Sequence, residues 1–329
     1  MTPSGPLLAV HAHPDDETLA TGALLAAWAR AGEATCVVTC TRGERGEVID
    51  SASHPTGLAH LAGDGPALAV HRERELHAAL AALGVTDHVF LDAVGGHDDG
   101  TPVRLEDSGM AWVGPGVAGP APDSGPAAFV RAPLDDAASR LAAVVRDRRP
   151  AVVVTYEAGG GYGHPDHVRA HDVTVRALEL AADATAPLPG GPWAATRWEV
   201  VAPSSAVRAA RATLGADPGV RRLLADGFTL PDPDGELPPV AVADGEVTGR
   251  GPGEGVVEVD VAAVLDPLLA ALRAHRTQVQ QVAPLDAPGV VARYALSNDE
   301  LAPVLAVAHL RVVGGDAGKG ATAPVGSAR

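Results

Sequence analysis

Positively charged residues are scarce in this 329-residue chain. Lysine and arginine together number 25 against 41 aspartates and glutamates, which gives a formal net charge of −16, and Lys319 is the only lysine. Nucleic-acid binding depends on clustered basic side chains that neutralise phosphates. The deficit therefore argues against a nucleic-acid partner and favours a small-molecule partner.

The chain also lacks any apolar run of the roughly 18 residues that a membrane span requires. Its first residues do not form a basic segment followed by an apolar one, which is the pattern of a secretory signal. We therefore expect a cytoplasmic protein with no membrane partner. The sequence leaves the oligomeric state open.

Cysteine is limited to Cys36 and Cys40, which fall in one β-type run at 34–40. On a strand that rises ~3.3 Å per residue they lie about 13 Å apart, too far for a disulfide or a shared metal ion. We expect two buried thiols. Any metal site must then be built from histidine and carboxylate ligands.

What the chain does have is a regular alternation of apolar β-type runs with helical patterns over residues 1–184. The expected strands are 7–11, 34–40, 88–92 and 151–156, and the expected helices are 17–31, 71–83, 135–149 and 166–183. This order predicts a Rossmann-like, doubly wound α/β fold with a mostly parallel sheet.

Beyond residue 184 the alternation loosens, and we expect a smaller C-terminal α+β region. It should contain strands at 197–203, 256–260, 290–296 and 306–313, and helices at 205–226 and 261–276. We predict three parts: a metal-binding catalytic core (1–184), a region that completes the substrate cleft (185–313) and a disordered tail (314–329).

Three segments rich in glycine, proline and aspartate interrupt this pattern, namely 43–70, 93–134 and 231–255. Loops this long in a compact domain are usually functional or disordered. We expect the first two to lie over the same edge of the sheet, and the third to form a loop or a hairpin.

Two polar clusters follow two of the apolar runs. His13-Pro14-Asp15-Asp16-Glu17 comes after 7–11, and His164-Pro165-Asp166-His167 comes after 151–156. Both runs are continuously apolar, as in parallel strands covered on both faces. Ligands of open α/β sheets bind where the carboxyl ends of such strands meet. We therefore expect the two clusters to converge into a metal site.

Proline is well suited to the first turn of a helix, so Pro14 places Asp15 and Asp16 at a helix N-terminus. The helix dipole favours ionised carboxylates at this position. We expect His13 and Asp16 to converge on one cation, while Asp15 points elsewhere and remains free.

In the second cluster the glycines at 159–161 and 163 permit a tight backbone crossing, and Pro165 starts a helix with His167 in its first turn. His167 is the expected third ligand. Two histidines and one aspartate leave a coordination position open, which is typical of a catalytic zinc site. Water bound there becomes acidic, and Asp15 can take its proton. The same ligand set also suits Fe²⁺ or Co²⁺.

Simpler interpretations account for other residues of the same types. Six of the thirteen histidines are expected to be ordinary surface or core residues: His54, His60, His77, His88, His275 and His309. For His171 a solvated helix position is favoured over support of the site. Asp15 and Asp16 could be mere helix caps if no second cluster existed. The glycine run at 159–161 lacks the spacing of a dinucleotide-binding loop.

The motif pair resembles that of the PIG-L/LmbE-like metal-dependent N-deacetylases, which remove acetyl groups from N-acetylglucosamine derivatives. The resemblance extends through 39–49, 107–110, 155–164, 276–279 and 295–298. This fuller set is similar to the branch that deacetylates 1-O-(2-acetamido-2-deoxy-α-D-glucopyranosyl)-D-myo-inositol in mycothiol biosynthesis. The sister mycothiol S-conjugate amidases carry a lysine where this chain has 18–21, and its absence favours the deacetylase.

The resemblance also implies roles for individual residues. His13, Asp16 and His167 match the zinc ligands, and Asp15 matches the general base. Three further residues match catalytic positions: Tyr162 polarises the acetyl carbonyl, and His164, held by Asp166, assists the tetrahedral intermediate and the leaving amine. Four residues occupy positions that contact the sugar or the inositol: Glu47, Arg72, Asp107 and Met110.

Two further functions remain open at this point. One is a catalytically inert sugar-binding or scaffold protein of the same fold, because fold alone does not define function. The other lies within the enzyme class: amide cleavage in mycothiol conjugates, or deacetylation of N-acetylglucosaminides in general.

Overall fold

The computed structural model describes residues 4–95, 104–114, 117–247 and 255–314. A central eight-stranded sheet has the order β3-β2-β1-β6-β7-β13-β9, with β8 paired to β7. Its strands are β1 (Leu7–His11), β2 (Thr35–Thr39), β3 (Asp87–Phe90), β6 (Val152–Tyr156), β7 (Thr196–Pro203), β8 (Ala241–Val242), β9 (Gly255–Asp260) and β13 (Val307–Val313). All pairs are parallel except β7–β13 and β13–β9. The predicted doubly wound, mostly parallel α/β fold is confirmed.

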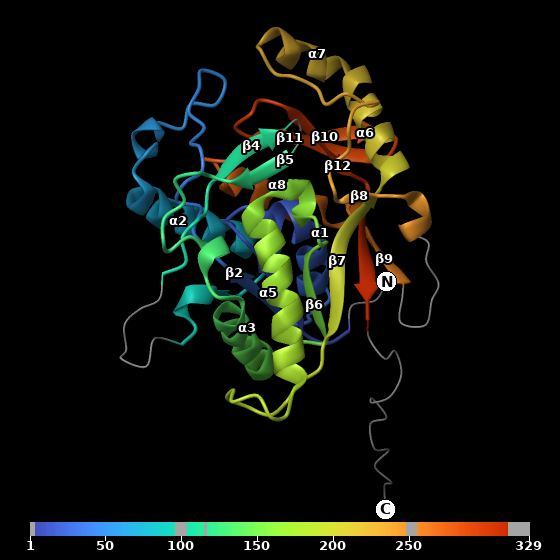
Figure 1. Cartoon of the computed structure of the whole chain (residues 1–329). Helices are drawn as coiled ribbons and strands as arrows, with labels where there is room; N and C mark the ends of the chain where they lie inside the picture. The colour runs from blue at the N-terminus through green and yellow to red at the C-terminus, as the bar shows by residue number, and fades with distance from the viewer. Residues whose placement is uncertain (1–3, 96–103, 115–116, 248–254, 315–329) are drawn as a thin grey trace, which may run out of the picture.

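Helices cover both faces of this sheet (Figure 1). The helices in the described part of the chain are α1 (Asp16–Arg30), α2 (Gly65–Leu83), α3 (Leu134–Arg148), α4 (Gly160–Gly163), α5 (Pro165–Ala182), α6 (Ser204–Ala216), α7 (Pro218–Ala225) and α8 (Leu265–Ala274). Alternate residues of β1 point to opposite faces of the sheet and pack into two different hydrophobic cores. Leu7 and Ala9 join the core beneath α1, α2 and α8, whereas Leu8 and Val10 join the core beneath α3 and α5. The continuous apolar run of β1 therefore serves two cores.

A second, antiparallel sheet consists of β10 (Gln280–Ala287), β11 (Val290–Ala295) and β12 (Leu301–Leu305). The hairpin of β4 (Met110–Gly114) and β5 (Val117–Pro120) lies toward the same end of the molecule, which is the end where β7 terminates (Figure 1). Within the described residues, short 3₁₀ segments connect the elements at Ala59–Leu61, Leu91–Ala93, Phe129–Arg131, Asp244–Val247 and Ala262–Val264.

The central sheet continues across the predicted boundary at residue 184. β7 pairs in parallel with β6, and β13 and β9 extend the same sheet on the far side of β7. The division into a core and a C-terminal region thus stays a prediction. Apart from Gly314, the predicted disordered tail lies outside the described residues, as do parts of the loops 93–134 and 231–255.

Several boundaries differ from the prediction for identifiable reasons. Helix α2 begins at Gly65 rather than at residue 71, because the Asp64 side chain accepts a hydrogen bond from the Ala67 N–H and a proline lies in the first turn. The described part of 231–255 contains no hairpin; it contributes β8, which pairs with the distant β7. No helix in the described part of the chain has the length and apolar character needed to cross a membrane.

Candidate metal centre

The two polar clusters lie side by side at the carboxyl end of the central sheet. Strands β1 and β6 are neighbours, with Leu7 opposite Val152 and Ala9 opposite Val154. The chain leaves β1 into 12–15 and leaves β6 into 157–164, so both segments emerge at one edge. A hydrogen bond from the Ala12 N–H to the Tyr156 hydroxyl (3.0 Å) joins the two exits directly.

His13, Asp16 and His167 converge around the Asp16 carboxylate. His13 Nδ1 lies 3.3 Å from Asp16 Oδ2, and His167 Nε2 lies 3.2 Å from Asp16 Oδ1. All three side chains are buried. The predicted ligand residues are therefore brought together, with one oxygen of the Asp16 carboxylate beside each histidine ring.

The remaining ring nitrogens of both histidines are held by oxygen acceptors. His13 Nε2 donates to Asp166 Oδ2 (3.1 Å), and His167 Nδ1 donates to the Gly160 carbonyl (3.1 Å). This leaves an unprotonated His13 Nδ1 and an unprotonated His167 Nε2 facing Asp16 in the neutral rings. His167 Nε2 is buried without a hydrogen-bond partner. Metal-ligating histidines are oriented in the same way, so the residues present fit a divalent cation.

Carboxylates surround His13 on its other side. Asp107 Oδ1 lies 3.6 Å from His13 Nε2, next to Asp166. Burial alone lowers the pKa of His13, but Asp107, Asp16 and Asp166 together raise it well above its usual range. Burial alone would raise the pKa of the Asp16 carboxyl. His167 and His13 outweigh burial and hold this pKa well below its usual range. The site is built to carry positive charge.

Among the residues that the structure describes, two overlapping groups bring three potential ligand atoms within 4.8 Å of one another: His13 with His164 and His167, and His13 with Asp107 and Asp166. His164 Nδ1, however, accepts a hydrogen bond from the Asp166 N–H (3.1 Å). The proton of a neutral His164 is then on Nε2, which makes that nitrogen a donor rather than a ligand. Burial, followed by the charges of His13 and His167, lowers the pKa of His164 to about 2.

Asp15 lies immediately before α1 in an unusual backbone conformation, with φ 120°. Its carboxylate accepts no hydrogen bond from the residues that the structure describes. Burial and the adjacent Asp16 carboxylate raise the pKa of Asp15 to about 8. Asp15 and Asp16 thus differ as expected: Asp16 contacts both histidines, and Asp15 remains free.

Tyr162 projects over the cluster from a glycine-rich turn. Gly160, Gly161 and Gly163 have φ of 69°, 76° and 89°, which confirms the tight crossing expected of this segment. The Tyr162 ring is 5.0 Å from the His167 ring and 5.9 Å from the His164 ring, edge to face in both cases. Tyr162 is 42% exposed, so a ligand that enters from solvent can contact this residue.

The prediction that Asp166 holds His164 needs a correction. The Asp166 carboxylate binds His13 and Ser108, whose N–H and hydroxyl both donate to it (2.9 and 2.5 Å). Only the backbone N–H of Asp166 reaches His164. At the N-terminus of α5 the His164 side chain caps the helix, and the fully buried Asp166 side chain is directed at the opposite cluster.

The predicted substrate contacts lie around this centre. Arg72, on α2, is buried and donates to the carbonyls of Gly43 (2.5 Å) and Glu47 (2.9 Å), while its Nε has no hydrogen-bond partner. Asp107 touches His13, as described above. The Glu47 side chain is exposed, and Met110 is half-buried at the start of β4. Asp107 thus contacts the centre directly, Arg72 interacts electrostatically with Asp15 and Asp107, and Glu47 contacts Arg72 through its backbone carbonyl.

Sequence reasoning assigned no role to Tyr156 or Ser108. The Tyr156 ring stacks on His167 at 4.3 Å, and Ser108 fixes Asp166. Both residues lie within segments that resemble the deacetylase family, and this resemblance was the sequence signal that could have identified them. The expectation of a solvated His171 was wrong: this side chain is buried, with Nε2 3.3 Å from Glu199. The expectation of two buried free thiols at Cys36 and Cys40 is confirmed.

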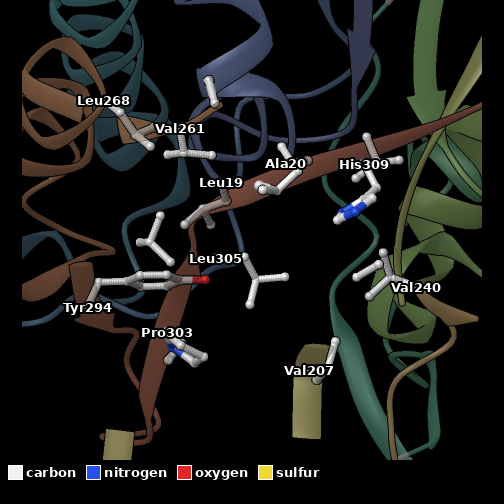
Figure 2. A pocket seen from close by; sticks show the side chains of 18 of the residues that line it. Leu19, Ala20, Val207, Val240, Val261, Leu268, Tyr294, Pro303, Leu305 and His309 are labelled. Atoms are coloured by element: carbon white, nitrogen blue, oxygen red, sulfur yellow. The ribbon is translucent and has the colours of Figure 1, made fainter. Parts of the chain in front are cut away.

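A separate pocket of about 340 Å³ lies beside α1 (Figure 2). Its walls are mostly apolar and include Leu19 of α1, Val240, Leu305 and Tyr294, whose hydroxyl group points into the pocket. None of the predicted site residues lines it. The pocket and the candidate metal centre therefore share no lining residue, although both use residues of the first turns of α1.

A doubly wound sheet with a histidine and carboxylate centre at its carboxyl edge defines an α/β enzyme that uses a metal ion. Comparison with known proteins narrows this class. The PIG-L family model, described as GlcNAc-PI de-N-acetylase, matches residues 8–178. The chain belongs to this family of deacetylases.

Relatives and solved structures give the following similarities. The 1D-myo-inositol 2-acetamido-2-deoxy-alpha-D-glucopyranoside deacetylase of Kineococcus radiotolerans is 47% identical, over 95% of this chain and 78% of that protein. The protein of the same description from Rhodococcus erythropolis is 41% identical, over 95% of this chain and 92% of that protein. A solved structure of the zinc inhibited form of teicoplanin deacetylase Orf2 is 20% identical with a TM-score of 0.45, and covers 83% of this chain and 85% of that chain.

Proposed function

We propose that this enzyme removes the N-acetyl group of 1-O-(2-acetamido-2-deoxy-α-D-glucopyranosyl)-D-myo-inositol, giving glucosaminyl-inositol and acetate in mycothiol biosynthesis. Relatives of this description are 41% to 47% identical over 95% of the chain. The observation that carries the chemistry is the free Asp15 carboxylate beside the converging His13, Asp16 and His167. We further propose that the enzyme works in the cytoplasm on this small-molecule substrate.

His13 Nδ1, His167 Nε2 and the Asp16 carboxylate would hold one Zn²⁺ ion, although Fe²⁺ or Co²⁺ suits the same donors. Such an ion lowers the pKa of a bound water and polarises the acetyl carbonyl. The tautomers support this assignment, because hydrogen bonds to Asp166 and to the Gly160 carbonyl direct both lone pairs toward Asp16.

Asp15 takes the proton of the attacking water, whose oxygen forms a bond to the acetyl carbon. Tyr162 donates its hydroxyl hydrogen bond to the oxygen that becomes negative. The C–N bond then breaks, the proton that Asp15 took from the water passes to the amine nitrogen as acetate leaves, and the Nε2–H of neutral His164 assists by donating a hydrogen bond to the tetrahedral intermediate. The bond from the Asp166 N–H to His164 Nδ1 supports this last role, since it places the proton on Nε2.

Substrate recognition would fall to Arg72, Asp107, Glu47 and Met110. They come from α2, from the segment before β4, from the loop after β2 and from β4 itself. Charged groups that bind sugar hydroxyls discriminate strongly, because a ligand that lacks the hydroxyl leaves a desolvated group unpaired. An inositol-containing substrate should therefore be preferred over the simple sugar.

The substrate proposal is tested by comparing kcat/KM for three compounds: the acetylated glucosaminyl-inositol, N-acetylglucosamine and a mycothiol conjugate. The first should be clearly the best substrate. Equal values for the two sugars would indicate a generic deacetylase. A preference for the conjugate would indicate the amidase, and no turnover with the metal-loaded enzyme would favour a binding protein.

The metal proposal is tested on His13→Ala and His167→Ala, with His60→Ala at an exposed position as the control. The first two variants should lose most bound metal, measured by elemental analysis, together with activity, and the control should retain both. Stoichiometric metal in the two ligand variants would contradict the assignment.

A further inference from the structure

Asp15 has a strained backbone conformation, which neighbouring contacts must stabilise. Its φ of 120° is rarely adopted by residues other than glycine and costs of order 1–3 kcal/mol. Such a conformation persists only where the surroundings over-determine it. Two contacts do so here by holding the Pro14–Asp15 peptide group, one at its N–H and one at its carbonyl, and both lead to the same distant turn at 275–278.

The first contact runs through Glu17. The Asp15 N–H donates to Glu17 Oε2 (3.0 Å). The other carboxylate oxygen of Glu17 accepts hydrogen bonds from the Thr18 hydroxyl (2.5 Å) and from His275 Nε2 (2.8 Å), although His275 lies 258 residues away in the sequence. Glu17 and His275 are both completely buried. The acceptor of the Asp15 N–H is therefore fixed in place.

The second contact acts on the residue before Asp15. Gln278 Nε2 donates to the Pro14 carbonyl at 2.6 Å, and the Gln278 side chain is buried. Gln278 and His275 belong to one turn, closed by a hydrogen bond from the Gln278 N–H to the His275 carbonyl (3.0 Å). One turn thus constrains both polar groups of the Pro14–Asp15 peptide, and the peptide on the other side of Asp15 is held within α1, where the Asp15 carbonyl accepts from the Thr18 and Leu19 N–H groups (3.0 and 2.9 Å).

We propose that the turn 275–278 is a positioning element for Asp15, in which Gln278 holds the Pro14 carbonyl and His275 acts through Glu17. The inference rests on the proposed function, because it takes Asp15 as the general base. It assigns to the C-terminal part of the chain a role in the chemistry as well as in substrate binding.

The same turn also fixes elements that carry the proposed sugar contacts. The N–H and the hydroxyl of Thr277 donate to the Glu75 carboxylate (2.9 and 2.6 Å), one helical turn after Arg72 on α2. The Ile49 N–H donates to the Thr277 carbonyl (2.9 Å), two residues after Glu47. The turn therefore sets the register between Asp15 and the side of the cleft that would hold the sugar.

The test compares Gln278→Met with Gln280→Met. Both variants replace a buried glutamine in the same segment by a side chain of similar size. Gln280 Nε2 donates to the Leu296 carbonyl (3.0 Å) and to Asp299 (2.8 Å), so its loss removes two hydrogen bonds and has no link to Asp15. The pair separates positioning from general stability.

We expect Gln278→Met to lower kcat by roughly 10- to 100-fold, as a misplaced catalytic group does, with KM within about 2-fold and full metal content. Gln280→Met should keep kcat within about 2-fold even if its melting temperature falls further. His275→Leu should lower kcat to a similar extent. His275→Gln retains a donor toward Glu17 and should recover part of the rate. These two His275 variants test the same inference if Gln278→Met does not fold.

A crystal structure of each variant supplies a readout that is independent of turnover. Asp15 should leave the region of positive φ in Gln278→Met and keep it in Gln280→Met. An Asp15 φ that stays near 120° in both, or a wild-type kcat in Gln278→Met, overturns the inference. A metal-loaded wild-type enzyme without deacetylase activity would instead count against the proposed function, and the crystallographic comparison would still decide the positioning.

Discussion

Asp15 and Asp16 are chemically identical neighbours that their surroundings make different. Asp16 accepts the backbone N–H of His13 (2.8 Å), which stabilises its charge, and it faces two imidazole nitrogens. Asp15 has no such partners, and its pKa is raised by burial and by Asp16. One carboxylate is therefore suited to hold a cation and the other to exchange a proton.

Replacement of Asp15 by Asn tests this difference without disturbing the backbone, since Asn tolerates positive φ as well as Asp does. Asp15→Asn should keep its metal and melting temperature and lose kcat by roughly 10²–10⁴-fold, the range for a positioned acid–base group. Acetate release and metal content are measured on the same preparation. A near wild-type rate would remove Asp15 from the mechanism.

Tyr162→Phe should depress kcat by as much as about 10²–10³-fold, the effect of losing one donor to a developing oxyanion. KM should change much less, because the hydrogen bond strengthens in the transition state. Stability should hardly change, since the ring is 42% exposed. If KM rises while kcat is unaffected, Tyr162 serves binding alone.

The residue types and spacing of the two clusters were sufficient to predict which side chains converge. The contacts of Asp166 and His171 could not be predicted, because they depend on where a helix side chain is directed. Asp166 adjoins His164 in sequence but sends its carboxylate to His13 and Ser108. Sequence adjacency says nothing about such directions.

At the scale of elements, the site depends on how each strand passes into the next helix. After β1 the chain turns through Asp15, and after β6 it turns through α4, where Gly160 and Gly161 have positive φ. Gly160 is also crowded: a Cβ atom there would lie 2.7 Å from the Val168 nitrogen and 3.0 Å from His167 Cβ. Its carbonyl accepts the His167 hydrogen bond, so this glycine links the turn to a proposed ligand.

Gly160→Ala should destabilise the fold by more than about 1 kcal/mol, because alanine meets both the strained φ and the crowding. Metal affinity should fall as well, since His167 loses its orientation. Gly255→Ala is the control, with no heavy atom within 4 Å of the added methyl group. Denaturant unfolding and metal titration measure the two effects; equal stability of the two variants would contradict the argument.

The strands of the small sheet show why some elements were not predicted. β10 contains Pro284 and β12 contains Pro303, and proline removes a ladder hydrogen bond and obscures the strand pattern. Both are edge strands of the three-stranded sheet, where proline is tolerated, and β10 has register shifts on either side of the Ala283–Pro284 pair. The strands β1, β2, β3 and β6 of the first 184 residues contain no proline, and the alternating units were predicted with shifted ends, including the earlier start of α2 at Gly65.

At the scale of the whole molecule, the C-terminal segments return to the first elements of the chain. β13 and β9 extend the central sheet, and the turn 275–278 reaches the start of α1. Contacts across more than 250 residues leave no periodic signal in one sequence, so His275 was expected to be an ordinary histidine. Its partner Glu17 lies in the first cluster, but nothing in the sequence pairs them.

Acid stability is a property of the whole fold to which His88 should contribute. This residue of β3 has Nε2 3.0 Å from the Thr39 hydroxyl, and burial, followed by the nearby His77, lowers its pKa from 6.5 to about 4. Arg42 also lowers the pKa, and Glu17 and Asp87 oppose the shift. Between about pH 6.5 and pH 4 the unfolded chain binds a proton here that the folded protein does not, so stability falls as the pH falls through this window.

His88→Gln removes this titration and keeps a side chain that can bond to Thr39. From pH 7 to pH 5 the wild-type protein should lose about 1–2 kcal/mol more unfolding free energy than the variant. Denaturant unfolding at both values, with metal held saturating, measures the difference, and His60→Gln at an exposed position should follow the wild type. Identical pH dependence in the wild type and His88→Gln would mean that His88 is protonated in the folded protein as readily as in the unfolded chain.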